Sequence, residues 1–240
     1  MNASVEAAPT EILGERFAEV VERSARRAIA DRGLFTLALS GGSAATLLLP
    51  RLVAAAVDWR RVDVFWIDER AVPLDDPESN AGAVLAPFIR RVPLRAERVH
   101  VMRGDAPDLD AAAAEYEGTM RRVLGDRPEL DLVFLGMGPD GHVASLFPGH
   151  PLLEERHRWV VAIRDSPKPP PARLTVTMPV LQEARERVLF VAGTEKGRTL
   201  NDALAHPERG VPVARALAGP GATIVLVDED AASALQAPIR

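Results

Sequence analysis

Strand and helix signals alternate along most of this chain, and this alternation constrains the fold more than any other feature. Residues 109–124 are among the clearest helical stretches; they are rich in alanine, and Asp108 is placed to cap the first turn. Short apolar runs rich in β-branched and aromatic residues lie between such stretches. Alternating strands and helices are typical of a parallel sheet covered by helices. We therefore expect an α/β fold, a single-domain Rossmann-like open sheet over residues 1–240, mostly parallel, with helices on both faces.

The boundaries of the expected elements follow from the same two periodicities. Apolar residues recur at helical spacing over residues 10–30, and Gly33 marks the end of that helix. Further helices are expected over residues 44–56, 79–90, 109–124, 195–204 and 213–217. Strands are expected over residues 34–39, 62–67, 132–135, 159–163, 188–191 and 223–227.

Composition limits the chemistry and the partners. The chain has 240 residues, 47% of them hydrophobic, which is enough for a sizeable core. It contains no cysteine, which excludes disulfides, thiolate metal ligands and cysteine nucleophiles. A net charge of −5 argues against nucleic acid bound through bulk charge. No apolar run could span a bilayer, and residues 1–10 lack a secretory pattern, so we expect a cytoplasmic protein without a membrane partner.

A glycine-rich loop follows the strand expected at residues 132–135 and carries a histidine. Gly138, Asp140, Gly141 and His142 lie on this loop. Ligands of open α/β sheets gather beyond the carboxyl ends of strands, and an imidazole can accept a proton near neutral pH. His142 is therefore a candidate general base. The alternative is a histidine that packs in the core or on a surface loop, although the glycines favour close approach of a ligand.

A second turn of small residues, Ser40, Gly41, Gly42 and Ser43, lies between an expected strand and an expected helix. Its backbone N–H groups and the start of the helix suit an anion such as phosphate. The turn matches neither the Walker A motif nor the GxGxxG fingerprint, so nucleotide binding is not indicated. The alternative is an ordinary strand-to-helix turn capped by Ser43.

Two charged residues, Asp68 and Arg70, follow the strand expected at residues 62–67. Because parallel strands end at the same edge of a sheet, both side chains are expected near the two glycine-rich loops. The guanidinium of Arg70 suits bidentate binding of phosphate, and Asp68 is a candidate catalytic carboxylate. The acidic residues within 75–78 fit a solvated surface cluster ahead of a helix capped by Ser79.

In these segments the chain resembles the 6-phosphogluconolactonases of the glucosamine-6-phosphate isomerase/6-phosphogluconolactonase superfamily, and the resemblance spans nearly the whole sequence. Three long motifs match in order: Ser-Gly-Gly-Ser at 40–43, Asp-Glu-Arg-x-Val-Pro-x-Asp-Asp-Pro-x-Ser-Asn at 68–80, and Gly-Pro-Asp-Gly-His-x-Ala-Ser-Leu-Phe-Pro-Gly at 138–149. Residues 173–177 and 193–196 are similar to further motifs. The chain departs from the pattern at Ala44-Ala45, where Thr-Pro is common, and at Val143, where threonine is usual.

The resemblance implies hydrolysis of 6-phospho-D-glucono-1,5-lactone to 6-phospho-D-gluconate in the pentose phosphate pathway. This chemistry requires a deprotonated water, a stabilised oxyanion and a handle for the phosphate. We expect His142 to act as the base, with Asp68 and Asp140 as further catalytic residues. The expected substrate-binding and phosphate-binding residues are Ser40, Gly41, Gly42, Ser43, Arg70, Gly138, Gly141, Arg173 and Lys196.

The expected partner is a small sugar-phosphate lactone, and the expected assembly is a monomer or weak homodimer. No histidine pair has the i, i+4 spacing of a metal site, so neither a metal nor another cofactor is expected. Two other functions share this fold. The isomerases and deaminases of the superfamily carry Phe-Asn-Glu-Pro where this chain has Ser-Leu-Phe-Pro at 145–148, so the glutamate that assists ring opening is missing. A non-catalytic sugar-phosphate-binding domain of the kind attached to bacterial repressors would not need His142, and no helix-turn-helix segment is visible.

Overall fold

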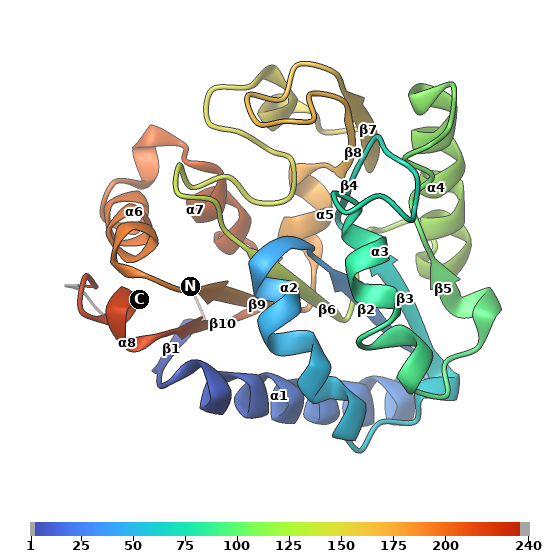
Figure 1. Cartoon of the computed structure of the whole chain (residues 1–240), viewed down its shortest axis with the longest axis horizontal. Coiled ribbons are helices and arrows are strands. Elements are labelled where there is room, and N and C mark those ends of the chain that lie inside the picture. Colours follow the sequence, from blue (N-terminus) through green and yellow to red (C-terminus); the bar gives the residue numbers. More distant parts are fainter. Residues whose placement is uncertain (1–2, 236–240) are drawn as a thin grey trace.

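A seven-stranded parallel sheet forms the centre of the computed structural model, which describes residues 3–235 (Figure 1). The strand order is β1-β10-β9-β6-β2-β3-β5, and every neighbouring pair runs parallel. The open α/β architecture expected from the sequence is confirmed. The strands are β1 (Ala3–Ala7), β2 (Phe35–Leu39), β3 (Val62–Trp66), β5 (Val99–His100), β6 (Leu132–Gly136), β9 (Glu186–Val191) and β10 (Ala222–Val227).

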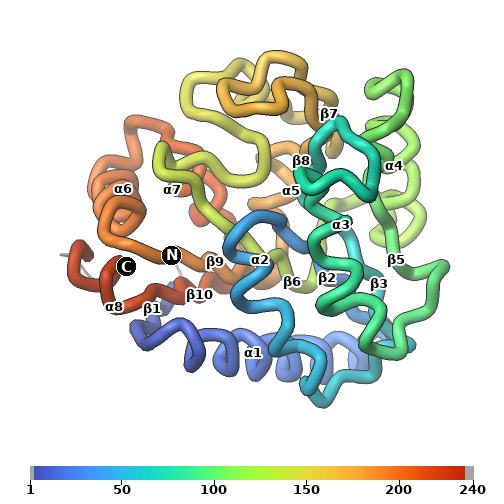
Figure 2. Tube along the Cα trace, viewed as in Figure 1, coloured from blue at the N-terminus to red at the C-terminus, as the bar shows by residue number. Residues whose placement is uncertain are grey.

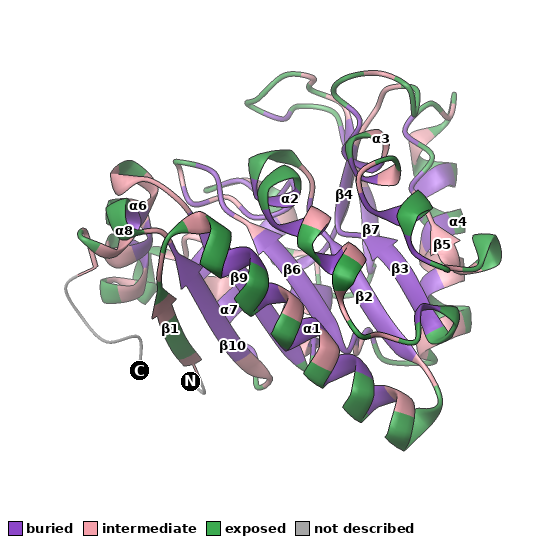
Figure 3. Cartoon of the chain, turned by 60° about the horizontal axis from the view of Figure 1, so that its bottom comes forward, coloured by how far each residue is buried: buried purple, intermediate pink, exposed green. Residues whose placement is uncertain are grey.

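Helices cover both faces of this sheet, because its central strands are apolar on both sides. Along β6, Phe134 packs against Phe17 of the first helix, whereas Val133 and Leu135 belong to the core on the opposite face. Figure 3 shows the buried strands beneath the exposed outer side of that first helix. One face carries α1 (Thr10–Arg32), α2 (Gly42–Leu48) and α3 (Asn80–Leu85). The other carries α4 (Leu109–Leu124), α5 (Met178–Glu183), α6 (Thr194–Ala205), α7 (Pro212–Leu217) and α8 (Glu229–Ala232).

A second, antiparallel sheet of three strands lies beside the carboxyl ends of the main sheet. It consists of β4 (Asp68–Arg70), β8 (Arg173–Val176) and β7 (Val160–Ile163), with β8 in the middle. The strand predicted at residues 159–163 exists, but it lies in this second sheet, which the expectation of a single, mostly parallel sheet did not include. Its partner β8 is a neighbour in the chain that folds back antiparallel, which needs no helical crossover.

Several predicted helix boundaries are confirmed and two are wrong. Gly33 ends α1 with φ of +77°, and the Asp108 and Ser79 side chains cap α4 and α3. The helix expected over residues 44–56 is α at its start only, because Pro50 cannot continue the ladder and residues 49–54 form a 3₁₀ turn. Likewise α3 ends two residues before Pro87. No helix within residues 3–235 is long and apolar enough to cross a membrane.

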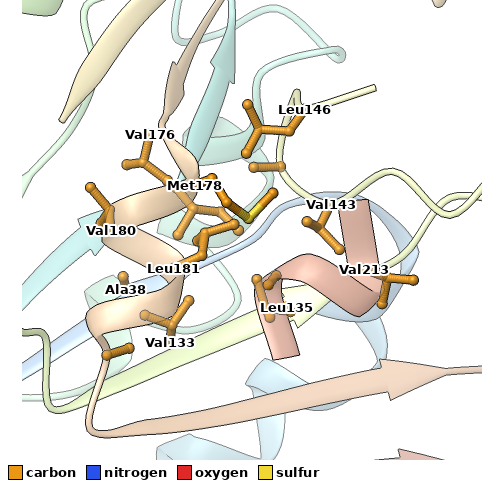
Figure 4. Packing of buried hydrophobic residues seen from close by; sticks show 14 of the residues in the cluster. Ala38, Val133, Leu135, Val143, Leu146, Val176, Met178, Val180, Leu181 and Val213 are labelled. Carbon is orange, nitrogen blue, oxygen red and sulfur yellow. The ribbon is translucent and has the colours of Figure 1, made fainter. Parts of the chain in front are cut away.

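The long segment between β6 and β8 rises above the carboxyl ends of the strands, at the top of the view in Figure 2. Its first part is anchored in the core. Val143 is fully buried and packs with Leu135 and Val213 (Figure 4). The residue next to His142 therefore faces the protein interior, so the methyl group found here in place of the usual hydroxyl lies outside the cleft described below.

Candidate active site

The order in which the chain adds strands to the sheet reverses between β2 and β6, and a cleft of about 170 Å³ opens there. From β2 the chain continues to β3 on one side, whereas β6 joins β2 from the other side. Loops at such a switch point diverge and leave a crevice at the carboxyl ends of the strands. The lining residues are Ser40, Gly41, Gly42, Ser43, Ala44, Asp68, Arg70, Asn80, Gly136, Met137, Gly138, His142, Ala144, Arg173, Phe190, Ala192 and Lys196.

Most of the residues predicted for the site line this cleft, but Asp140 and Gly141 do not. Asp140 contacts His142 instead. Gly141 has φ of +81°, and a Cβ there would lie 2.5 Å from a methyl of Val211. The structure thus gives Gly141 a role in the turn rather than in contact with a ligand, because its left-handed conformation and close packing both require glycine.

His142 and Asp140 form a carboxylate–imidazole pair at the cleft. Nδ1 of His142 lies 2.5 Å from Oδ1 of Asp140, so Nε2 is the ring nitrogen that this contact does not engage. The imidazole also packs against Phe147, with ring centroids 4.7 Å apart. Partial burial acts to raise the pKa of Asp140, but the charge of His142 and its hydrogen bonds outweigh that effect and lower the pKa. Asp140 is therefore an anion that fixes the ring orientation and can stabilise an imidazolium.

Gly138 leaves room for this imidazole. A Cβ at position 138 would lie 2.0 Å from Cε1 and 2.2 Å from Nδ1 of His142. No side chain fits there unless the ring moves. Glycine is therefore required at position 138 by packing against the candidate base and not by a left-handed φ angle.

Asp68 lies at the start of β4 and is held from two sides. Nδ2 of Asn80 donates to its Oδ1 at 3.1 Å, and Oγ of Ser145 donates to its Oδ2 at 2.8 Å. Asn80 in turn packs directly on Gly41, where a Cβ would lie 2.0 Å from its amide oxygen. Sequence reasoning did not single out Asn80 or Ser145. Both lie in the quoted motifs, but only the fold brings them to Asp68.

The neighbouring Glu69 is buried and organises the loop between β4 and α3. Its carboxylate accepts hydrogen bonds from the backbone N–H groups of Arg70, Asn80 and Ala81 and from the Ser79 hydroxyl. Burial raises the pKa of Glu69, although these donors oppose the shift. The loop that carries Asn80 to the cleft is therefore fixed from inside.

Two arginines meet at the cleft because β4 pairs with β8. The register places Arg70 directly opposite Arg173. Nε of Arg70 is buried and has no hydrogen-bond partner among residues 3–235, while its Nη1 donates to the Glu78 carbonyl at 2.7 Å. Burial lowers the pKa of Arg173, and repulsion from Arg70 adds to that effect. An anion between the two guanidinium groups would relieve this repulsion.

Most donors of Arg173 are already engaged. Its Nε and Nη2 bind the carbonyl groups of Lys168, Pro169 and Pro170, and Nη1 reaches Ser145 Oγ at 3.4 Å. Arg173 therefore pins the proline-rich loop at 166–171 and faces a ligand through Nη1 only, a narrower role than the sequence predicts. Lys168 contributes its carbonyl, and its side chain is exposed.

Lys196 supplies a third cation from the first turn of α6. Burial lowers the pKa of its ammonium, although Glu195 opposes the shift. Within the described part of the chain, no hydrogen bond or ion pair is made by this ammonium, so it is available to a ligand. No cluster of His, Asp and Glu side chains among residues 3–235 is arranged to hold a metal ion.

Comparison with known proteins agrees with this architecture. The family model for glucosamine-6-phosphate isomerases/6-phosphogluconolactonase matches residues 9–225, so the chain belongs to this family. The 6-phosphogluconolactonase of Rattus norvegicus is 39% identical over 245 residues, which cover 99% of this chain and 95% of that protein.

Two further relatives extend the comparison. A probable chloroplastic 6-phosphogluconolactonase 3 of Oryza sativa is 40% identical over 211 residues, covering 82% of this chain, and the match spans only 64% of the rice protein. The solved structure of 6-phosphogluconolactonase from Trypanosoma cruzi is 28% identical with a TM-score of 0.83, covering 98% of this chain and 97% of that one.

Proposed function

We propose that the protein hydrolyses 6-phospho-D-glucono-1,5-lactone to 6-phospho-D-gluconate, a step of the pentose phosphate pathway, with His142 as the general base. One observation carries this proposal: His142, which is paired with Asp140, lines the same cleft as Arg70, Arg173 and Lys196. A base and an anion site within one cleft fit a phosphorylated ester. The names of the relatives support the same substrate.

The chemistry follows from the geometry of the pair. Nε2 of His142 takes a proton from water while the water oxygen bonds to C1 of the lactone. The carbonyl oxygen becomes an oxyanion that the backbone N–H groups of the glycine-rich loops stabilise. The bond from C1 to the ring oxygen then breaks, and the imidazolium returns its proton to that oxygen. The products are a carboxylic acid, which ionises, and a free hydroxyl, so that one water is consumed.

The phosphate orients the lactone and takes no part in the bonds that form or break. In the proposed complex it lies among Arg70, Lys196 and the turn formed by Ser40, Gly41, Gly42 and Ser43, with Arg173 contributing through Nη1. Binding energy from this remote group holds the carbonyl near His142 and so lowers the barrier at the reacting carbon. Unphosphorylated glucono-1,5-lactone is therefore expected to be a poor substrate.

The isomerase or deaminase alternative fits this cleft less well. The position of the family's ring-opening glutamate is occupied by Phe147, which packs against His142 and offers no proton. A purely sugar-phosphate-binding domain would have no use for the aligned Asp140–His142 pair.

The decisive test is the hydrolysis of freshly generated 6-phosphogluconolactone without added metal. We expect the protein to exceed the spontaneous rate, and His142→Ala to lower kcat by about 10²–10⁴-fold with little change in KM. His157→Ala, at an exposed histidine outside the cleft, is the matched control and should be unaffected. Equal rates with and without the protein would refute the lactonase function. A normal kcat for His142→Ala would transfer the role of base to Asp68.

A further inference from the structure

Asp68 carries a negative charge, whereas the other charged residues of the cleft are positive. Among the described residues that line the cleft it carries the only carboxylate, whereas Arg70, Arg173 and Lys196 are cationic. The cations suit the phosphate, which a carboxylate repels. Asp68 offsets part of the repulsion between Arg70 and Arg173, and it suits a different part of the ligand. The hydroxyl groups of a sugar lactone are neutral donors that a carboxylate can accept.

The hydrogen bonds around Asp68 have a fixed direction. A guanidinium can only donate, so Arg173 Nη1 donates to Ser145 Oγ, and the single hydroxyl proton of Ser145 must go to Oδ2 of Asp68. Asn80 donates to Oδ1 from the opposite side. Each carboxylate oxygen thus accepts one protein donor and keeps one acceptor site free, since a carboxylate offers about four such sites.

Ser145 is unusually well fixed for a loop residue. It is fully buried, and its backbone N–H donates to Thr175 Oγ1 at 3.2 Å. The preceding Ala144 has φ of +49°, the one left-handed residue other than glycine in the described chain. A left-handed conformation is strained for a residue with a Cβ and persists only where the surroundings enforce it. It occurs here between His142 and Ser145.

We propose that Ser145 is a positioning residue that locks Asp68 as a hydrogen-bond acceptor for one ring hydroxyl of the lactone, so that Asp68 sets substrate specificity. This inference rests on the proposed function. It assigns Asp68 to recognition of the sugar, whereas proton transfer stays with His142. The same loop carries His142 and Ser145, and Ser145 holds Asp68. Correct binding of the sugar is thereby coupled to the placement of His142.

The test compares kcat/KM for the 6-phospholactone and for its 2-, 3- and 4-deoxy counterparts. Wild-type protein should discriminate against one of them. Ser145→Ala and Asp68→Asn should lower kcat/KM for the parent lactone by about 10-fold to 100-fold and leave that deoxy compound nearly unchanged, because a hydrogen bond to a charged group is lost only where the hydroxyl exists. The double variant should be no worse than Asp68→Asn alone.

Ser24→Ala is the matched control. Ser24 is a buried serine that also donates to a buried carboxylate, that of Glu186, outside the cleft. It should lower thermal stability without altering discrimination. Calorimetry of 6-phosphogluconate binding reports on Ser145→Ala without turnover. Failure of the wild-type protein to hydrolyse the lactone would therefore contradict the proposed function and leave this binding test of the inference in place.

Two results would overturn the inference. Equal losses on the parent and all deoxy lactones would assign Asp68 to the chemical step, and additive losses in the double variant would show that Ser145 acts independently of Asp68. If Ser145→Ala does not fold, Asp68→Asn carries the same comparison alone.

Discussion

Gly138→Ala tests whether the placement of His142, rather than its presence, determines the rate. The methyl group would lie 2.0 Å from Cε1 and 2.2 Å from Nδ1 of the imidazole, and 2.8 Å from Oδ1 of Asp140. The backbone at Gly138 is not left-handed, so alanine itself can adopt it. The strain therefore falls on the His142–Asp140 pair.

The size of the effect follows from these distances. Carbon atoms in ordinary contact are about 3.5–4.0 Å apart, so the ring has to retreat by more than about 1 Å. Misplacement of a reacting group by about 1 Å can cost about 10²-fold in rate. Overpacking at a buried site lowers stability by about 1–3 kcal/mol. We expect kcat to fall about 100-fold while KM, set mainly by the phosphate, changes little.

The assay is steady-state lactone hydrolysis, with folding checked by thermal unfolding. Gly118→Ala is the control, because a Cβ at this position of α4 would meet nothing within 4 Å. It should keep wild-type kcat and gain up to about 1 kcal/mol of stability. A folded Gly138→Ala protein with wild-type kcat would refute the argument that a fixed imidazole is required.

Lys196→Ala should raise KM about 10-fold or more without a matching loss in kcat, since the variant loses the proposed charge-assisted contact with the phosphate. Because burial lowers the pKa of Lys196, its ammonium loses its proton at a lower pH than a surface lysine does, and affinity for 6-phosphogluconate should weaken as pH rises toward about 10. Lys196→Arg, measured by the same calorimetric titration, should remove that decline. Val143→Thr, which restores the residue usual in the family, should leave kcat unchanged and reduce the free energy of unfolding by about 1–3 kcal/mol, because Val143 is fully buried. A higher kcat in that variant would show that the hydroxyl reaches the reaction.

The parts of the fold that the sequence predicts correctly are those with strong local periodicity. Strands such as β2, β6 and β10 are predominantly apolar runs, and the sequence predicts all three. β1 was missed because it is a half-exposed edge strand of Ala, Ser, Val and Glu. β4 was missed because its three residues, Asp-Glu-Arg, have no apolar pattern, and only pairing with the distant β8 makes them a strand.

The sequence likewise predicts some residues of the candidate site but not the contacts that orient them. His142, Asp68 and the Ser40–Ser43 turn could be named because each follows a recognisable strand. The hydrogen bonds that orient them depend on contacts distant in sequence, such as Ser145 with Asp68, which are 77 positions apart. The reduced role of Arg173 likewise comes from carbonyl groups of the proline-rich loop, whose path no local pattern specifies. The single-domain organisation, the oligomeric state and the substrate contacts stay predictions.

The register of the small sheet also has a consequence for stability. It sets two guanidinium groups, Arg70 and Arg173, opposite each other across an antiparallel pair, an arrangement that is unfavourable in itself and only partly offset by Glu78 and Asp68. A phosphate bound as proposed would supply the missing counter-charge to the folded protein and not to the unfolded chain. At a ligand concentration 100 times the dissociation constant, such linkage adds about 2.7 kcal/mol to the free energy of unfolding. The resistance of this protein to heat or proteolysis would then rise and fall with the supply of the proposed substrate and product.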